Sequence, residues 1–330
     1  MKLKEKINKN IRGLIMFKKL KIMGLLLILS VGAYGCTKEE IKEDKAQKIT
    51  LVLSVGGVHD ESFNQGAWEG AQKASQELGV DVSYLESNSD ADYAPNIETA
   101  IDQESDIVVG VGFQVGDAIK EAAKAHPEQQ FVTIDSTYEE GLDNVRNITF
   151  NEQEAGYLTG LIAGKMTKTN AIGWIGGLDI PSCSNFYVGY EKGAKEVNPD
   201  IKVIKQFTNS FTDAAKGRVV AEGMVNEGAD IIFMAAGGGN AGSLEVVREN
   251  NIKAIGVDMA NNYLAPEHII TSALKNVGEG LKLTIKDFVD GNFTSGEVKY
   301  DLSNGGVGFE KTDLLSDEVI KFVEDKITSK

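Results

Sequence analysis

Apolar runs alternate with amphipathic stretches along most of the chain. The run ITLVLSV at 49–55 is followed by helical spacing over 62–78, which stops at Gly79, and the run DIVVGVG at 106–112 is followed by another such stretch. Glycine after a periodic stretch is a typical helix stop. Continuous apolar runs are typical of strands in a parallel sheet that helices cover on both faces. The pattern before residue 147 therefore predicts successive strand–helix units.

A second copy of this pattern begins after a short connection near 147–151. The alternation restarts with AIGWIGG at 171–177 and continues to KAIGVD at 253–258. Two such halves predict an α/β protein with two doubly wound parallel-sheet lobes, joined by a hinge, with a ligand cleft between their strand carboxyl ends. The expected first lobe comprises 49–148 plus 268–295, and the expected second lobe comprises 149–267 plus 296–330.

The N-terminus has the three parts of a secretory signal. Residues 1–35 carry eight Lys and Arg and one Glu, and an apolar core at 22–33 precedes Cys36. That core is shorter than the ~20 residues that a spanning helix needs. The arrangement resembles a bacterial lipoprotein signal, which implies that Cys36 becomes a lipidated first residue. We expect the charged segment 36–48 to be a disordered tether. The alternative is an ordinary signal peptide or an uncleaved anchor.

The charge balance excludes several partners of the folded body. The leader contributes +7 to a formal net charge of −15, so the chain from Cys36 onward carries −22. This excess of acid argues against nucleic acid and against an anionic membrane surface as partners. The second cysteine, Cys183, forms neither an intramolecular disulfide nor a Cys-pair metal site by itself. We expect it to be a small, partly buried residue rather than a reactive thiol.

One stretch, LVLSVGGVHDESFNQGAWEG at 51–70, joins an apolar strand, a glycine turn and a polar helix start. In α/β proteins, strand carboxyl ends and helix N-termini meet where a ligand binds. Asp60, Asn64 and Trp68 are therefore candidate contacts for a flat, hydrogen-bonding ligand, and Phe63 is expected to pack in the core. The alternative is that Asp60 or the neighbouring serine only caps the helix.

Three aspartates, Asp60, Asp135 and Asp258, each follow an apolar strand, so each is expected at a carboxyl edge. Carboxylates accept hydrogen bonds from ribose hydroxyls or ring N–H groups, and they repel phosphate. An aromatic from each half, Trp68 and Phe186, would suit a stacked heteroaromatic base. Lys275, between a strand and a helix, is either a surface lysine or a donor to a ribose oxygen.

A glycine-rich segment, GGGNAG at 237–242, satisfies the G-x-G-x-x-G pattern of dinucleotide-binding proteins. It lies late in the second half rather than on the first turn of its lobe, so we expect a tight turn that lines the cleft instead of an NAD site. The three histidines are scattered, no serine has a G-x-S-x-G context, and no zinc spacing occurs. The sequence therefore predicts no cofactor, no metal site and no catalytic residue.

Six segments occur in an order that is specific when taken together: HDESFNQGAWEG at 59–70, GFQVGDAIKEAAKAHPEQQFVTID at 112–135, FYVGYEKGAKEVNP at 186–199, AAGGGNAG at 235–242, IGVD at 255–258 and TSALKNV at 271–277. With the leader, they resemble the basic membrane protein family of ABC-transporter substrate-binding lipoproteins, whose best-understood branch is of the purine nucleoside receptor A type. The resemblance implies a type I periplasmic-binding-protein fold and capture of a nucleoside between the lobes.

The resemblance also implies roles for residues that match the family's motifs. Trp68 and Phe186 would stack on the base and Asp135 would contact its edge, with Asp60 and Asn64 as further polar contacts. The group around the ribose would comprise Gly238, Asp258 and Lys275. The segment between Asp258 and Lys275 is shorter here than in some relatives.

These observations predict a monomeric, lipid-anchored receptor on the extracytoplasmic face of the cell membrane. It would bind a purine nucleoside such as guanosine, inosine or adenosine and deliver it to the permease and ATPase subunits of an ABC importer. The alternatives are a receptor of the same fold for riboflavin or a sugar, and a nucleoside-processing enzyme. A transcriptional regulator on the same scaffold would need a basic helix-turn-helix, where this chain has a signal and an acidic body.

Overall fold

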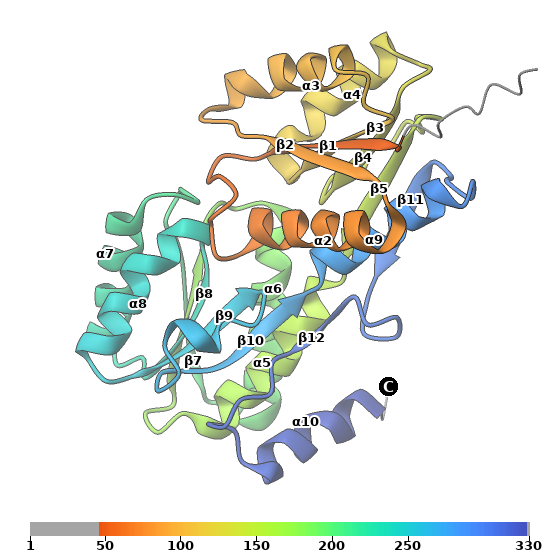
Figure 1. Ribbon diagram of the computed structural model, residues 1–330. Helices are drawn as coiled ribbons and strands as arrows, with labels where there is room; N and C mark the ends of the chain where they lie inside the picture. The colour runs from red at the N-terminus through yellow and green to blue at the C-terminus, as the bar shows by residue number, and fades with distance from the viewer. Residues whose placement is uncertain (1–45, 329–330) are drawn as a thin grey trace, which may run out of the picture. The chain divides into compact units, whose positions relative to one another are not determined.

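The computed structural model describes residues 46–328, in which twelve strands form two sheets (Figure 1). The predicted signal peptide 1–35, the lipidation at Cys36 and nearly all of the tether 36–48 lie outside the described residues. The first sheet contains β1 (Lys48–Leu53), β2 (Asp81–Leu85), β3 (Ile107–Val111), β4 (Gln130–Ile134), β5 (Val145–Phe150) and β11 (Gly296–Tyr300). The second contains β6 (Ala171–Gly176), β7 (Lys202–Phe207), β8 (Ile231–Ala235), β9 (Lys253–Asp258), β10 (Ile269–Lys275) and β12 (Val307–Phe309).

The two sheets repeat one strand order. The first runs β11-β5-β4-β3-β1-β2 and the second runs β12-β10-β9-β8-β6-β7. Neighbouring strands run parallel, except that β12 runs antiparallel to β10. Each sheet is doubly wound, because its strand order reverses direction once, between β1 and β3 in the first sheet and between β6 and β8 in the second. The prediction of two parallel-sheet α/β lobes is confirmed.

Burial on both faces explains why the strands are continuous apolar runs. In β1, Ile49, Leu51 and Leu53 pack in the cluster that contains the apolar face of α2, and Val52 packs on the opposite side with residues of α3 and α4. Alternate residues of a strand point to opposite faces, so both sets must be apolar when helices cover both sides.

Helices cover both faces of each sheet (Figure 1). Beside the first sheet lie α2 (Phe63–Leu78), α3 (Tyr93–Asp102), α4 (Gly116–Ala125) and α9 (Val277–Val289). Beside the second sheet lie α5 (Glu152–Met166), α6 (Pro181–Val197), α7 (Ala214–Asn226), α8 (Asn240–Glu249) and the C-terminal α10 (Asp317–Thr328). Among the described residues, no helix combines the length and apolar character that a membrane span requires.

Glycines bring α5 and α6 into backbone contact. A Cβ at Gly156 would lie 2.2 Å from the carbonyl oxygen of Phe186, and a Cβ at Gly189 would lie 2.0 Å from that of Gln153. Side chains at these positions would force the helices apart. The close approach therefore sets the N-terminal turns of the two helices side by side at the carboxyl edge of the second sheet.

The strand pairings differ from the predicted division of the chain. The division placed 268–295 in the first lobe, but β10 pairs with β9 and β12 in the second sheet. Only α9 of this segment joins the first lobe, where it packs on α2. The division also placed 296–330 in the second lobe, but β11 pairs with β5 in the first sheet. An apolar pattern identifies a strand without indicating its sheet, because either sheet buries it equally well.

Candidate ligand-binding site

A pocket lies between the carboxyl ends of the two sheets, and it encloses about 660 Å³ of space that is partly open to solvent. Segments that follow β1, β3, β4, β6 and β8 line it, together with the ends of β9 and β10. The pocket thus includes the point in each sheet where the strand order reverses, which is where doubly wound proteins bind ligands. The predicted residues that line it are Asp60, Asn64, Asp135, Phe186, Asp258 and Lys275.

Asp60 and Asn64 line the pocket, but their polar groups also hold the start of α2. The Asp60 carboxylate accepts hydrogen bonds from the backbone N–H groups of Ser62, Asn64 and Gln65 at 2.9–3.1 Å. The Asn64 side chain accepts from the Ser54 hydroxyl and donates to the Ser54 carbonyl. Asp60 therefore acts as the helix cap that the sequence offered as an alternative, and Asn64 ties α2 to the end of β1.

Asp258 connects the two lobes across the pocket. The Ser62 hydroxyl in the first lobe donates to its carboxylate at 2.5 Å, and nearby the Asn261 side chain donates to the Glu61 carbonyl at 3.0 Å. Desolvation raises the pKa of Asp258 to about 6, since it outweighs the opposing effects of Lys275 and the Ser62 hydroxyl. The structure is therefore a state in which the lobes touch, with a carboxyl at their contact that titrates near neutral pH.

Lys275 is a buried cation among carboxylates rather than a surface lysine. Its ammonium donates to Asp135 Oδ2 at 2.6 Å and to Glu152 Oε1 at 2.9 Å, and its side chain is 2% exposed. Burial opposes the charge, but Asp135, Glu152 and Asp258 together raise the pKa of Lys275. The lysine therefore stays charged throughout the physiological range.

Asp135 lines the pocket and has one carboxylate oxygen that makes no hydrogen bond. Its Oδ2 accepts from Lys275, whereas its Oδ1 is buried without a hydrogen-bond partner. Asp135 has a backbone φ of 69°, and Asp258, at the corresponding place in the second lobe, has a φ of 63°. Residues other than glycine rarely adopt this left-handed backbone conformation, because it costs free energy. The residues that do adopt it are often found at functional sites. A buried, unpaired carboxylate oxygen is an acceptor for an N–H or O–H donor of a ligand.

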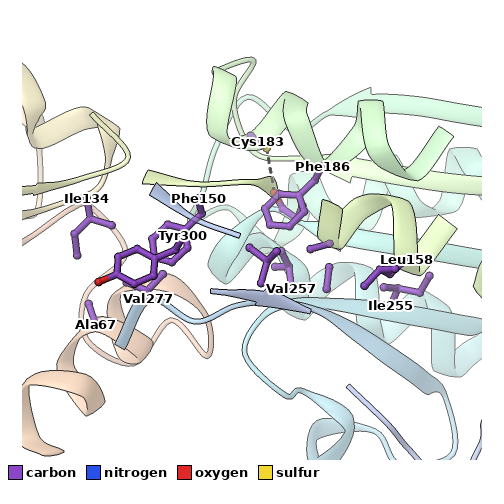
Figure 2. Packing of buried hydrophobic residues seen from close by; sticks show 14 of the residues in the cluster. Ala67, Ile134, Phe150, Leu158, Cys183, Phe186, Ile255, Val257, Val277 and Tyr300 are labelled. Atoms are coloured by element: carbon purple, nitrogen blue, oxygen red, sulfur yellow. Dashed lines mark hydrogen bonds between the residues drawn. The ribbon is translucent and has the colours of Figure 1, made fainter. Parts of the chain in front are cut away.

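Four phenylalanines line the pocket: Phe63, Phe113, Phe186 and Phe211. Phe63 and Phe113 belong to the first lobe, and Phe113 is 46% exposed. Phe186 is buried and packs edge-on against Phe233, with ring centroids 5.8 Å apart. Figure 2 shows Phe186 with Cys183 and Val257 in one group, and Phe150 beside Tyr300 in another. Aromatic residues from both lobes therefore line the pocket.

Trp68 does not line the pocket, contrary to the prediction. Its ring packs edge-on against Tyr84 of β2, with centroids 4.8 Å apart. Trp68 lies five residues after Phe63 on α2, which places it about 140° around the helix. Phe63, which was expected to pack only in the core, lines the pocket instead. Phe113 follows the carboxyl end of β3, so the strand-end rule that selected the aspartates would also have selected it.

The glycine-rich segment 237–242 serves as a turn and a helix contact. Gly237 lines the pocket, whereas the predicted Gly238 does not. A Cβ at Gly242 would lie 1.8 Å from the Ala214 carbonyl oxygen, so this glycine allows α8 to pack on α7. The third glycine of the apparent dinucleotide pattern is therefore explained by helix packing.

The remaining candidate chemistry is limited. Cys183 lines the pocket, is buried, and its Sγ lies 3.5 Å from the Ala235 carbonyl oxygen. Burial raises the pKa of this thiol to about 12, so it is protonated and unreactive at neutral pH. Within residues 46–328, no group of three His, Cys, Asp or Glu side chains is arranged to hold a metal ion.

The fold and the pocket define a solute-binding protein, in which two α/β lobes enclose a small molecule. A family described as "ABC transporter substrate-binding protein PnrA-like" matches residues 46–330. The chain belongs to this Bmp family. Its members are substrate-binding proteins of ABC transporters, and the resemblance seen in the sequence is confirmed.

Individual relatives agree with this assignment. The chain is 37% identical over 319 residues to the "ABC transporter nucleoside-binding protein BmpA" of Lactococcus lactis. This match covers 89% of this chain and 90% of the relative. It is 35% identical over 317 residues to "Basic membrane protein A" of Borreliella burgdorferi, which spans 94% and 93%. A solved ABC transporter solute-binding protein from Aeropyrum pernix superposes with a TM-score of 0.76 at 32% identity, over 86% of this chain and 80% of that one.

Proposed function

We propose that this protein is a purine nucleoside receptor that delivers its ligand to the permease and ATPase of an ABC importer. The leader supports attachment to the extracytoplasmic face of the cell membrane by a lipid on Cys36, and we propose that the receptor is a monomer. The observation that carries the ligand assignment is the buried, unpartnered Oδ1 of Asp135, a residue that lines the pocket together with phenylalanines from both lobes.

The charges in the pocket favour a neutral ligand. Asp60, Asp135 and Asp258 line it with a single lysine, whose ammonium already pairs with Asp135 and Glu152. A nucleoside offers hydroxyl and N–H donors to these carboxylates. A nucleotide would add phosphate charge that has no free cation among the residues lining the pocket.

The parts of the ligand can be assigned to parts of the pocket. Phe63 and Phe186, one from each lobe, would stack on the base in place of the Trp68–Phe186 pair that the sequence predicted. Asp135 Oδ1 would accept an N–H of the base edge. Asp258 and Lys275 would bind the ribose hydroxyls, and Asp60 would hold the α2 start rather than the ligand.

Calorimetry with a panel of ligands tests this function. Guanosine, inosine and adenosine are expected to bind with micromolar or tighter affinity. The matching 5′-monophosphates should bind at least about 100-fold more weakly, because desolvating a phosphate beside carboxylates, with no free cation to pair with it, is costly. Riboflavin and a set of hexoses and pentoses complete the panel. Binding of a sugar or riboflavin but of no nucleoside would contradict the ligand assignment, and chemical conversion of the recovered nucleoside would favour an enzyme.

Nucleoside affinity is expected to fall in acid because of Asp258. Hydroxyl donors prefer the ionised carboxylate, and the pKa of about 6 leaves roughly one-tenth of it ionised at pH 5. The affinity should therefore drop about tenfold between pH 7 and pH 5, with a midpoint near 6. Titrations at half-unit pH steps measure this. The variant Asp258→Asn, which cannot ionise, should remove the midpoint, and a drop of equal size in that variant would rule out Asp258 as the titrating group.

A further inference from the structure

Glu152 lies behind the pocket without lining it. It occupies the first turn of α5, is 3% exposed, and accepts a hydrogen bond from the Lys275 ammonium at 2.9 Å. Its other oxygen accepts from the Asn185 side chain at 3.3 Å. The pocket-lining residues include Lys275 but not Glu152. The hydrogen bond to Lys275 is therefore the contact through which Glu152 reaches the pocket lining.

The Glu152–Lys275 pair joins two points where the chain passes between lobes. Glu152 directly follows β5 and Asn151, where the chain leaves the first sheet. Lys275 ends β10, two residues before the start of α9, where the chain returns to the first lobe. Both side chains belong to second-lobe elements, whereas Asp135 follows β4 of the first lobe. If the lobes open about these crossings, Glu152 stays beside Lys275 because both belong to the second lobe. Asp135 belongs to the first lobe and would move away from Lys275.

We propose that Glu152 is a positioning residue for ligand recognition: it holds the Lys275 ammonium at the pocket edge, so that Asp135 pairs through one oxygen and offers the other to the ligand. This inference rests on the proposed function. Without Glu152, the ammonium has only the two pocket carboxylates, Asp135 and Asp258, as buried anionic partners. It would then shift toward them and occupy acceptors that the ligand needs.

The same arrangement sets the charge state of Asp258. The groups that face Asp258 are Ser62 and Asp60 on the β1–α2 segment, Asp135 after β4, Lys275 on β10 and the Cys183 thiol on α6. Glu152 and Asp258 share the charge of the Lys275 ammonium. Removal of the Glu152 charge gives Asp258 a larger share, so the pKa of Asp258 should fall.

The test compares Glu152→Gln with the wild-type protein in two measurements. Calorimetry at pH 7.5 with guanosine, inosine and adenosine should show about tenfold weaker binding, a typical effect of uncoupling one member of a charge network. An NMR titration of ligand-free protein with ¹³C-labelled aspartate carboxyls, with Asp258 assigned from Asp258→Asn, should show its midpoint lowered by about half a pH unit or more. A purely structural role would weaken binding and leave this midpoint in place.

The control is Glu154→Gln, which removes the same charge from the same helical turn. Glu154 accepts a hydrogen bond from the backbone of Leu302, which glutamine can also accept. This variant should bind within twofold of wild type with an unchanged Asp258 midpoint. Wild-type affinity in Glu152→Gln, or an unmoved Asp258 midpoint, would overturn the positioning role.

The experiment also distinguishes two other outcomes: a variant that does not fold, and a wild-type protein that binds no nucleoside. If circular dichroism shows that Glu152→Gln does not fold, Glu152→Asp takes its place. This variant keeps the negative charge on a side chain that is one methylene shorter. It should then bind about three- to tenfold more weakly, and wild-type affinity would overturn the inference. If the wild-type protein binds no nucleoside, the proposed function fails, and the titration of ligand-free Asp258 still decides whether Glu152 controls the charge of the pocket.

Discussion

Replacing Lys275 by methionine is expected to destabilise the protein by about 3–5 kcal/mol, the typical loss when one member of a buried ion pair is removed. The ammonium is the cation shared by Asp135, Glu152 and Asp258. Methionine fills similar space without charge, so the variant leaves carboxylates buried with no counterion. Urea unfolding at pH 7.5 measures the difference.

The loss should depend on pH in a defined direction. Without the ammonium, the buried carboxyls of Lys275→Met have raised pKa values in the folded state. The folded chain then binds more protons than the unfolded chain, so the stability of the variant falls as pH rises. The deficit relative to wild type should therefore be smaller at pH 5 than at pH 8.

Lys282→Met is the matched control for this prediction. Lys282 pairs with Glu77 and Glu279 at the surface of α2 and α9. Solvent screens surface pairs, so this variant should lose far less stability than Lys275→Met and show no comparable pH dependence. Equal losses in the two variants would mean that the Lys275 cluster has no special role in stability.

The strand-end rule explains how much of the site the sequence could predict. Asp135 and Asp258 follow apolar strands at equivalent places in two repeated halves, and the carboxyl ends of parallel strands share one edge of a sheet. The two acids and Lys275 do line one pocket. Their role in binding stays a proposal, but their proximity follows from topology that the hydrophobic pattern already indicated.

Other features depend on geometry that local patterns do not contain. Whether Phe63 or Trp68 faces the pocket depends on how α2 is rotated against its sheet. That rotation is set by the packing of α2 against β2 and α9. The sheet that β10 joins depends on where the chain crosses between lobes. The contact between Glu152 and Lys275 joins residues 123 positions apart and exists only because two crossings lie side by side.

The second large expected effect concerns ligand selectivity. Asp258→Ala should weaken binding of purine nucleosides by at least about 100-fold, because each hydrogen bond from a ribose hydroxyl to a charged acceptor contributes about 1.5–3 kcal/mol. Binding of the free bases guanine, hypoxanthine and adenine should change by less than about threefold, because they have no ribose and therefore no ribose contacts with Asp258 to lose. Calorimetry with each nucleoside and its base measures the ratio.

The comparison separates recognition from general damage to the pocket. Asp258→Ala also removes the acceptor of the Ser62 hydroxyl, and with it one contact between the lobes. A loss that came only from poorer lobe closure would weaken bases and nucleosides equally, and would remove the ribose assignment. Asp258→Asn keeps an acceptor for Ser62 and should retain an intermediate nucleoside affinity. Asp81→Ala, at an exposed position of β2, removes one negative charge far along the strand from the pocket edge and should leave both ligands unaffected.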